Sequence, residues 1–128
     1  MPEKKTVERA RNAKREGKAP TTQAGEFVHE EMEHIRRGQH GARSTKQAIA
    51  IGLSKARRSG VKLSPPKKGK ASARTRKQAQ RDLSRAKSGR KASPARSRAR
   101  SRALKREGRS AASRSALSRQ ARTARRKR

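Results

Sequence analysis

The sequence predicts a mostly α-helical and disordered protein: a small antiparallel helical hairpin followed by a long, basic, low-complexity C-terminal tail. Three observations favour this fold class. Of the 128 residues, 38% are charged, 27% are hydrophobic and one is aromatic. Apolar residues recur with a helical period only between residues 22 and 59. Elsewhere, burial worth roughly 25 cal/mol per Å² does not offset a backbone entropy cost of about 1–2 kcal/mol per residue, which is typical of disorder.

The net charge of +31 is distributed unevenly and divides the chain into three domains. The first forty residues hold nine bases and seven acids, whereas the rest of the chain holds 31 bases and two acids. We expect a polar flexible leader over 1–20, a helix-turn-helix hairpin over 21–63 and a disordered tail rich in Ser, Ala and Arg over 64–128. Within that tail, residues 72–87 are good helix formers and predict a transient helix that orders on a partner.

Residues 22–37, TQAGEFVHEEMEHIRR, predict the first helix of the hairpin. Thr22 is the expected N-cap, and Gly38 is the expected residue after the C-terminus. One face of this helix is apolar and consists of Ala24, Phe27, Val28, Met32 and Ile35. The opposite face is acidic and consists of Glu26, Glu30 and Glu33. Glu31 is expected to lie exposed beside the apolar stripe.

Residues 44–59 follow the turn GQHGAR and predict the second helix. Ser44 and Gln47 match a capping box, and Gly60 is the expected stop. The apolar stripe consists of Ala48, Ile49, Gly52, Leu53 and Ala56. The other face is basic and consists of Lys46, Lys55, Arg57 and Arg58. This core is thin for a hairpin, so a homodimer through the hairpin or bound nucleic acid is expected to stabilise it.

Nucleic acid is the expected partner, because a surplus of 31 positive charges requires a dense polyanion to neutralise it. Membrane binding is disfavoured, since membrane-surface helices use bulky apolar anchors and this chain has one Phe and no Trp or Tyr. No apolar run approaches the ~20 residues of a membrane span, and the first residues lack the apolar core of a secretory signal. The chain has no Cys. We therefore expect it to be cytoplasmic, on the nucleoid.

The string HEEMEH in the first helix suggests a metal site, but its spacing argues against one. A zinc-protease helix places two histidines at positions i and i+4, on one face. His29 and His34 stand at i and i+5, about 140° apart on a helix of 3.6 residues per turn, and His40 in the turn adds no third ligand. We expect no metal, no cofactor and no enzymatic activity.

Two short motifs in the basic region resemble repeats of linker-histone tails. Residues 64–67 (SPPK) and 93–96 (SPAR) both fit Ser-Pro-x-Lys/Arg. Proline fixes φ, and narrow minor grooves attract cations, so the resemblance implies contacts with the DNA minor groove. A solvated linker is the alternative interpretation of both. Residues 97–103 (SRARSRA) resemble the Arg-Ser repeats of RNA-binding proteins.

Residues 4–70 resemble a family of small basic bacterial proteins of uncharacterised function. The most specific part is STKQAIAIGLSKAR, which spans residues 44–57. The resemblance implies a bacterial nucleoid setting and brings no catalytic residue. It does not cover the Arg-Ser tail.

The expected function is non-catalytic, largely sequence-independent DNA binding and compaction, as in a nucleoid-associated or histone H1-like protein. The alternative is an RNA- or ribosome-associated basic protein, although the single aromatic residue disfavours base stacking. A third interpretation is a protein-interaction module whose tail is a tether. The predicted nucleic-acid-binding residues are Arg43, Lys46, Lys55, Arg57, Arg58, Lys62, Lys67, Lys68, Lys70, Arg96, Arg98, Arg100 and Arg102.

Overall fold

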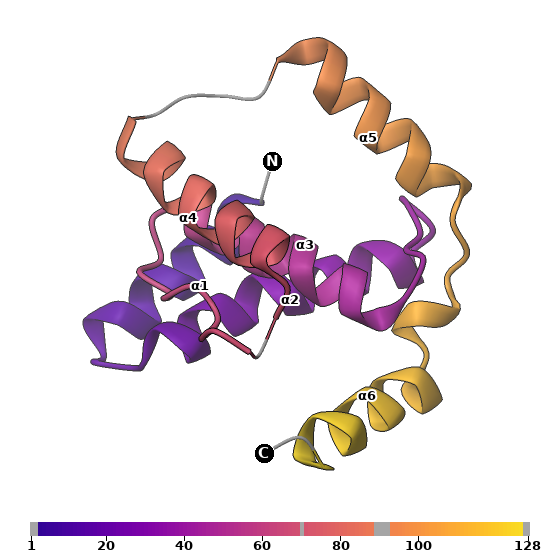
Figure 1. Ribbon diagram of the computed structural model, residues 1–128, viewed down its shortest axis with the longest axis horizontal. Helices are drawn as coiled ribbons and strands as arrows, with labels where there is room; N and C mark the ends of the chain where they lie inside the picture. The colour runs from indigo at the N-terminus through magenta and orange to yellow at the C-terminus, as the bar shows by residue number, and fades with distance from the viewer. Residues whose placement is uncertain (1–2, 70, 89–92, 127–128) are drawn as a thin grey trace.

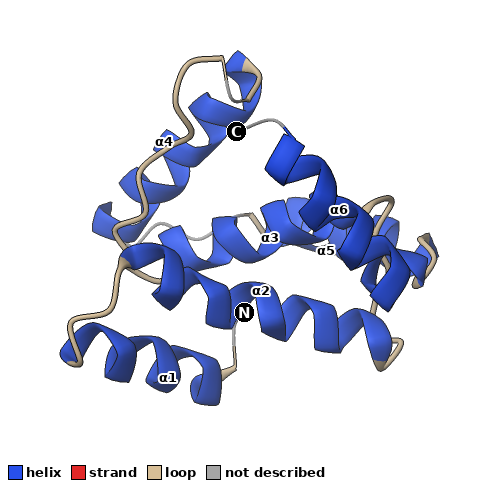
Figure 2. Ribbon diagram, turned by 90° about the horizontal axis from the view of Figure 1, so that it is seen from below, coloured by secondary structure: helices blue, strands red, loops and turns tan. Residues whose placement is uncertain are grey.

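The protein, seen in a computed structural model that describes residues 3–69, 71–88 and 93–126, is all-helical in that part of the chain (Figures 1 and 2). The elements are α1 (Lys4–Arg15), α2 (Pro20–Arg36), α3 (Thr45–Arg58), α4 (Ala73–Ser88), α5 (Pro94–Arg106), the short 3₁₀ turn η1 (Ser110–Ala112) and α6 (Arg114–Arg126). None of the described helices has the length and apolar character needed to cross a bilayer.

Helices α2 and α3 form the centre of the molecule, with α3 running back along α2 (Figure 2). Helix α2 begins at Pro20 rather than after Thr22, because proline is well suited to the first helical position. Gly38 follows its C-terminus with φ of 78°, as expected for the residue after a helix. At the start of α3, Ser44 Oγ accepts a hydrogen bond from the Gln47 N–H (3.2 Å).

The two central helices approach closely where Gly52 of α3 meets Val28 of α2. A Cβ atom at Gly52 would lie 2.7 Å from the Val28 Cα atom, closer than real Cβ atoms come to backbone. Glycine is therefore required at this crossing. It brings the flanking apolar side chains of α2 and α3 together.

The core consists of two clusters, one at each end of the α2–α3 pair. The first contains Met32, Ile35, Ala42, Ala48, Ala111 and Ala112, with Val28, Ile49 and Leu117 packed against it. The second contains Ala10, Ala24, Phe27, Ala56 and Val61, with Val7, Leu53 and Leu63 packed against it. Segments from both ends of the sequence therefore complete the core that α2 and α3 begin.

The predicted fold class, a small hairpin with a long disordered tail, is wrong. Helices α4, α5 and α6 occupy most of the region expected to be disordered, and η1 inserts Ala111 and Ala112 into the first core cluster. Backbone hydrogen bonds fix this segment: Gly41 N–H donates to Leu104 O (2.8 Å) and Ala42 N–H to Gly108 O (3.0 Å). Alanine buries little area, but its small size allows backbones to pack closely.

Helices α1 and α4 cover the central pair from different sides. In α1, small side chains face α2, with Thr6, Ala10 and Ala13 buried. Helix α4 lies against α3 and includes most of the segment expected to become helical only on a partner. Alanines contribute to both docked faces, through Ala10 and Ala13 of α1 and Ala79 of α4, and a search for large apolar side chains overlooks them.

Helix α5 lies apart from the others (Figure 1), and within the described part of the chain it packs against none of them. Every residue from Pro94 to Arg106 is exposed except Leu104, which is half-buried. The backbone hydrogen bond from Gly41 to Leu104 attaches its C-terminal end to the α2–α3 loop.

The crossing at Gly52 gives a stability prediction. We expect Gly52→Ala to lower the free energy of unfolding by about 1–3 kcal/mol, because the added methyl group collides with the Val28 backbone. Gly25 on α2 is the matched control, since a Cβ there meets nothing within 4 Å. Gly25→Ala should raise that free energy by about 0.5–1 kcal/mol through helix propensity. Urea unfolding followed by far-UV circular dichroism measures both, and equal effects would contradict the packing explanation.

Candidate nucleic-acid interface

Three of the four cations predicted to form the basic face of α3 point into the protein instead. Lys55 is half-buried and its Nζ donates a hydrogen bond to Glu31 Oε1. The Glu31 side chain is fully buried, not exposed as the sequence suggested. His40 Nε2 lies 3.0 Å from the other oxygen of this carboxylate. Lys55 therefore balances a buried negative charge.

Arg57 is 6% exposed and holds the segment that leaves α3. Its Nε donates to Leu63 O and its Nη2 to Ser64 O, each at 3.1 Å. Burial lowers the pKa of this guanidinium, and the Asp82 charge opposes that shift. Arginine stays protonated in proteins. Arg57 therefore keeps its charge while buried, and its N–H groups donate hydrogen bonds to backbone carbonyls.

Arg58 faces Asp82 of α4, with 3.9 Å between Nε and Oδ1. Asp82 is 1% exposed and also accepts hydrogen bonds from Ser54 Oγ (2.7 Å) and Gln78 Nε2 (3.2 Å). Burial is the main cause that lowers the pKa of Arg58, and Asp82 is the main opposing cause. Arg58 and Asp82 thus join α3 to α4.

The remaining predicted residues are exposed wherever the structure describes them. They are Arg43 and Lys46 at the start of α3, Lys62, Lys67 and Lys68 in the α3–α4 connection, and Arg96, Arg98, Arg100 and Arg102 on α5. Lys70 lies outside the described residues. The structure therefore gathers the predicted cations into three exposed groups and one internal group.

The largest exposed group of predicted cations is on α5, where the fold makes an ordered array of them. Arg98, Arg102 and Lys105 stand at i, i+4 and i+7 and so share one face of the helix. Arg96 and Arg100 share another face. Lys105 and Arg106, in the last turn of α5, extend this array beyond the predicted residues.

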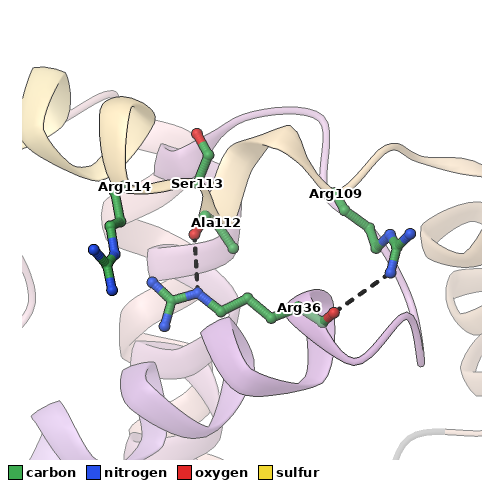
Figure 3. Close-up of a pocket in the computed structure, with 5 residues that line it drawn as sticks. All are labelled: Arg36, Arg109, Ala112, Ser113 and Arg114. Carbon is green, nitrogen blue, oxygen red and sulfur yellow. Dashed lines mark hydrogen bonds between the residues drawn. The ribbon is translucent and has the colours of Figure 1, made fainter.

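A second basic site is a hollow between α2, η1 and α6 that is lined by Arg36, Arg109, Ala112, Ser113 and Arg114 (Figure 3). Arg36 Nε donates to Ala112 O (3.1 Å), and Arg109 Nη1 donates to Arg36 O (3.4 Å). The Arg36 guanidinium lies on the same side of the hollow as Arg114, the first residue of α6, whereas the Arg109 guanidinium lies at the opposite end of Arg36 (Figure 3). The sequence did not predict this hollow, because Arg36 and Arg109 are far apart in the chain. They come together only because η1 packs against α2.

Both Ser-Pro motifs have structural roles here. Arg57 and Arg76 hold the first motif through Ser64 O and Pro66 O, the latter contact measuring 3.0 Å. In the second, Ser93 is the N-cap of α5, its Oγ accepting from the Arg96 N–H at 3.3 Å, and Pro94 is the first helical residue. A serine followed by proline is a typical helix start.

The inward orientation of Arg57 predicts an effect on stability. We expect Arg57→Lys to lower the free energy of unfolding by about 1–3 kcal/mol, because a single ammonium group cannot reproduce both bonds of the guanidinium fork. Arg43→Lys is the control, since Arg43 is exposed and this change also conserves charge. Urea unfolding of both variants measures the difference. Identical unfolding midpoints would show that Arg57 has no structural role.

The comparisons with known proteins bear on the first half of the chain. The model of the family described as "Family of unknown function (DUF6496)" matches residues 4–68, which contain α1, α2 and α3. Comparison with curated proteins and with solved structures gives no match. The expected resemblance to an uncharacterised family is thereby confirmed, whereas the linker-histone character of the C-terminal region stays a prediction. Because the matched segment makes up half of the 128 residues, this chain belongs to the family DUF6496.

Proposed function

We propose that this protein binds duplex DNA without catalysis and largely without regard to sequence, compacting it as a nucleoid-associated protein of the bacterial cytoplasm. The observation that carries the proposal is α5, a projecting helix with six exposed cations and no acidic residue. Apart from Leu104 at its C-terminal end, this helix buries no side chain against the rest of the described protein. Its array of charges instead suits contact with an external polyanion.

The Arg98 face of α5 carries about as many cations as one strand of duplex DNA has phosphates over the same length. At 1.5 Å per residue, the seven steps from Arg98 to Lys105 span about 10 Å of helix. A duplex carries one phosphate charge per ~1.7 Å of its axis, so about six phosphates lie along that length. The Arg98 face can therefore meet one strand while Arg96 and Arg100 remain available to the other strand or to a second duplex.

The hollow lined by Arg36, Arg109 and Arg114 supplies a further phosphate contact. Arg36 and Arg109 are each held by a backbone carbonyl, so less side-chain entropy is lost when their remaining N–H groups bind phosphate. Guanidinium groups bind phosphate oxygens through paired hydrogen bonds. With the hollow near α6 and the array on α5, two separate basic regions support bridging between DNA segments.

Contacts with phosphate are favoured over contacts with bases. The single aromatic residue, Phe27, is 1% exposed and belongs to the core, so it cannot stack on a base. Single-strand binders usually rely on such stacking. The RNA- or ribosome-associated alternative is therefore less favoured, and comparing duplex DNA with structured RNA tests it.

The test is a triple substitution on α5. We expect Arg98→Gln, Arg102→Gln and Lys105→Gln together to weaken duplex binding and to reduce the slope of log K against log salt by up to about 2.7, or about 0.9 per lost phosphate contact. If the native protein engages about ten phosphates, its own slope is near −9. Fluorescence anisotropy across a salt series measures both slopes, with duplex DNA and structured RNA compared side by side.

A matched control separates the α5 array from net charge alone. Arg9, Arg11 and Lys14 on α1 are exposed, and changing all three to Gln removes the same charge. The control should leave the slope nearly unchanged. Equal losses in both triple variants, a native slope near −2, or preferential displacement of DNA by RNA would each contradict the proposal.

A further inference from the structure

A cluster of carboxylates and imidazoles lies at the start of α1 and along α2. Glu30 and His34 stand at i and i+4 on α2 and so share one face of that helix. Glu3, just before α1, joins them, and one ligand atom from each of the three lies within 4.8 Å of the others. His34 is thus paired with Glu30 and not with His29, the histidine that the HEEMEH string suggested.

Glu30 has a buried carboxylate oxygen without a partner. The residue is 5% exposed, and its Oε1 accepts a hydrogen bond of 2.6 Å from the Glu3 N–H. Among the described residues, its Oε2 has no hydrogen-bond partner. A buried carboxylate oxygen is costly unless a donor or a cation compensates it. The Glu30 carboxylate therefore lacks a partner that its burial requires.

His34 faces a carboxylate through each of its ring nitrogens. Nε2 lies 3.3 Å from Glu3 Oε1, and Nδ1 lies 3.9 Å from Glu31 Oε1, while the residue is 8% exposed. A neutral imidazole carries one N–H, so one of the two nitrogens then presents a lone pair to an acceptor. A metal ion at Nε2 resolves this conflict and leaves Nδ1–H directed at Glu31, the arrangement typical of metal-bound histidines.

The charges of the cluster also favour a cation. Glu3, Glu30 and Glu31 contribute three carboxylates, and Lys55 neutralises one of them. His40 contacts Glu31 through Nε2, and its Nδ1 lies 2.9 Å from Gly41 O. The three carboxylates outnumber Lys55, the one permanently charged cation that pairs with them among the described residues. An added divalent ion therefore meets a site with excess negative charge.

We propose that Glu3, Glu30 and His34 bind a divalent transition-metal ion through Glu3 Oε1, Glu30 Oε2 and His34 Nε2. Two carboxylates and one imidazole suit ions of the zinc class. The ion links the start of α1 to the C-terminal half of α2. Glu31 is the positioning residue that orients His34. Glu31, His34 and His40 form a second possible group of ligands, but Lys55 already pairs with the Glu31 carboxylate.

The test uses the full chain without a histidine tag, stripped of metal with a chelator and titrated with zinc in a calorimeter. We expect one zinc ion per chain and a rise in the thermal midpoint on binding. Glu30→Gln and His34→Gln should each raise the Kd for zinc at least tenfold, since each removes a ligand. Cobalt in place of zinc should give a visible absorption that both substitutions reduce.

Two controls on the same helix leave the site intact. Glu33→Gln removes a carboxylate that pairs with Arg36 at 3.1 Å, and His29→Gln removes an exposed histidine. Both should bind zinc as the native chain does. If His34→Gln fails to fold by circular dichroism, Glu3→Gln replaces it, because Glu3 is exposed and lies before the first helix.

Three results would overturn the proposal. Zinc affinity unchanged in Glu30→Gln would remove Glu30 from the site. Affinity lost in His40→Gln but kept in Glu30→Gln would place the ion between Glu31, His34 and His40 instead. Absence of zinc binding, with a higher thermal midpoint in Glu30→Gln, would mean that Glu30 is an uncompensated buried carboxyl group and not a metal ligand.

Discussion

Two buried carboxylates, Glu31 and Asp82, are the constraint on which the rest of the structure depends. A chain with a net charge of +31 has nine acidic residues, so the position of each acid strongly affects which cations can lie inside. Glu31 pairs with Lys55 and contacts His40. Asp82 pairs with Arg58 and accepts hydrogen bonds from Ser54 and Gln78. Each buried acid thereby draws a cation of α3 inward and joins two elements. Removing one partner of such a pair leaves an uncompensated buried charge, which typically destabilises a protein by about 3–5 kcal/mol.

Small residues explain how so basic a chain can still form a core. The large apolar side chains are few, but Gly52 allows α3 to approach the Val28 backbone, and Ala111 and Ala112 fill the space beside Met32 and Ile35. Gly41 serves the same purpose where the α2–α3 loop meets Glu107 and Gly108. Close backbone contact gains dispersion energy and hydrogen bonds without bulky side chains. The C-terminal region therefore folds by fitting against the central helices rather than by burying large apolar area.

The sequence predicted what depends on local chemistry and missed what depends on contacts between distant segments. The Ser44 cap and the glycines at 38 and 60 located α2 and α3 within a few residues, because caps and stops act over one helical turn. Helix α5 has no apolar stripe that would predict it. The stripe of α6 consists of Leu117, Ala121 and Ala124 at i, i+4 and i+7, and it was overlooked because it is mostly alanine. The turn η1 packs only because α2 and α3 are already adjacent. The basic face of α3 was misjudged for the same reason. A helical wheel shows that Arg57 and Arg58 lie opposite the apolar stripe, but it does not show that α4 and the connection after Leu63 cover that side.

This division between inward and outward cations changes how the protein would bind a polyanion. A disordered tail loses conformational entropy when it binds, and any of its charges can meet any phosphate. In a folded array, the cations paired inside the protein are not available to a polyanion. The cations on α5 keep fixed spacings of one and two helical turns. Binding then costs less ordering entropy and depends on which face meets the duplex. If the proposed binding occurs, the acids that neutralise Lys55 and Arg58 act on it indirectly, because they determine which cations remain on the surface.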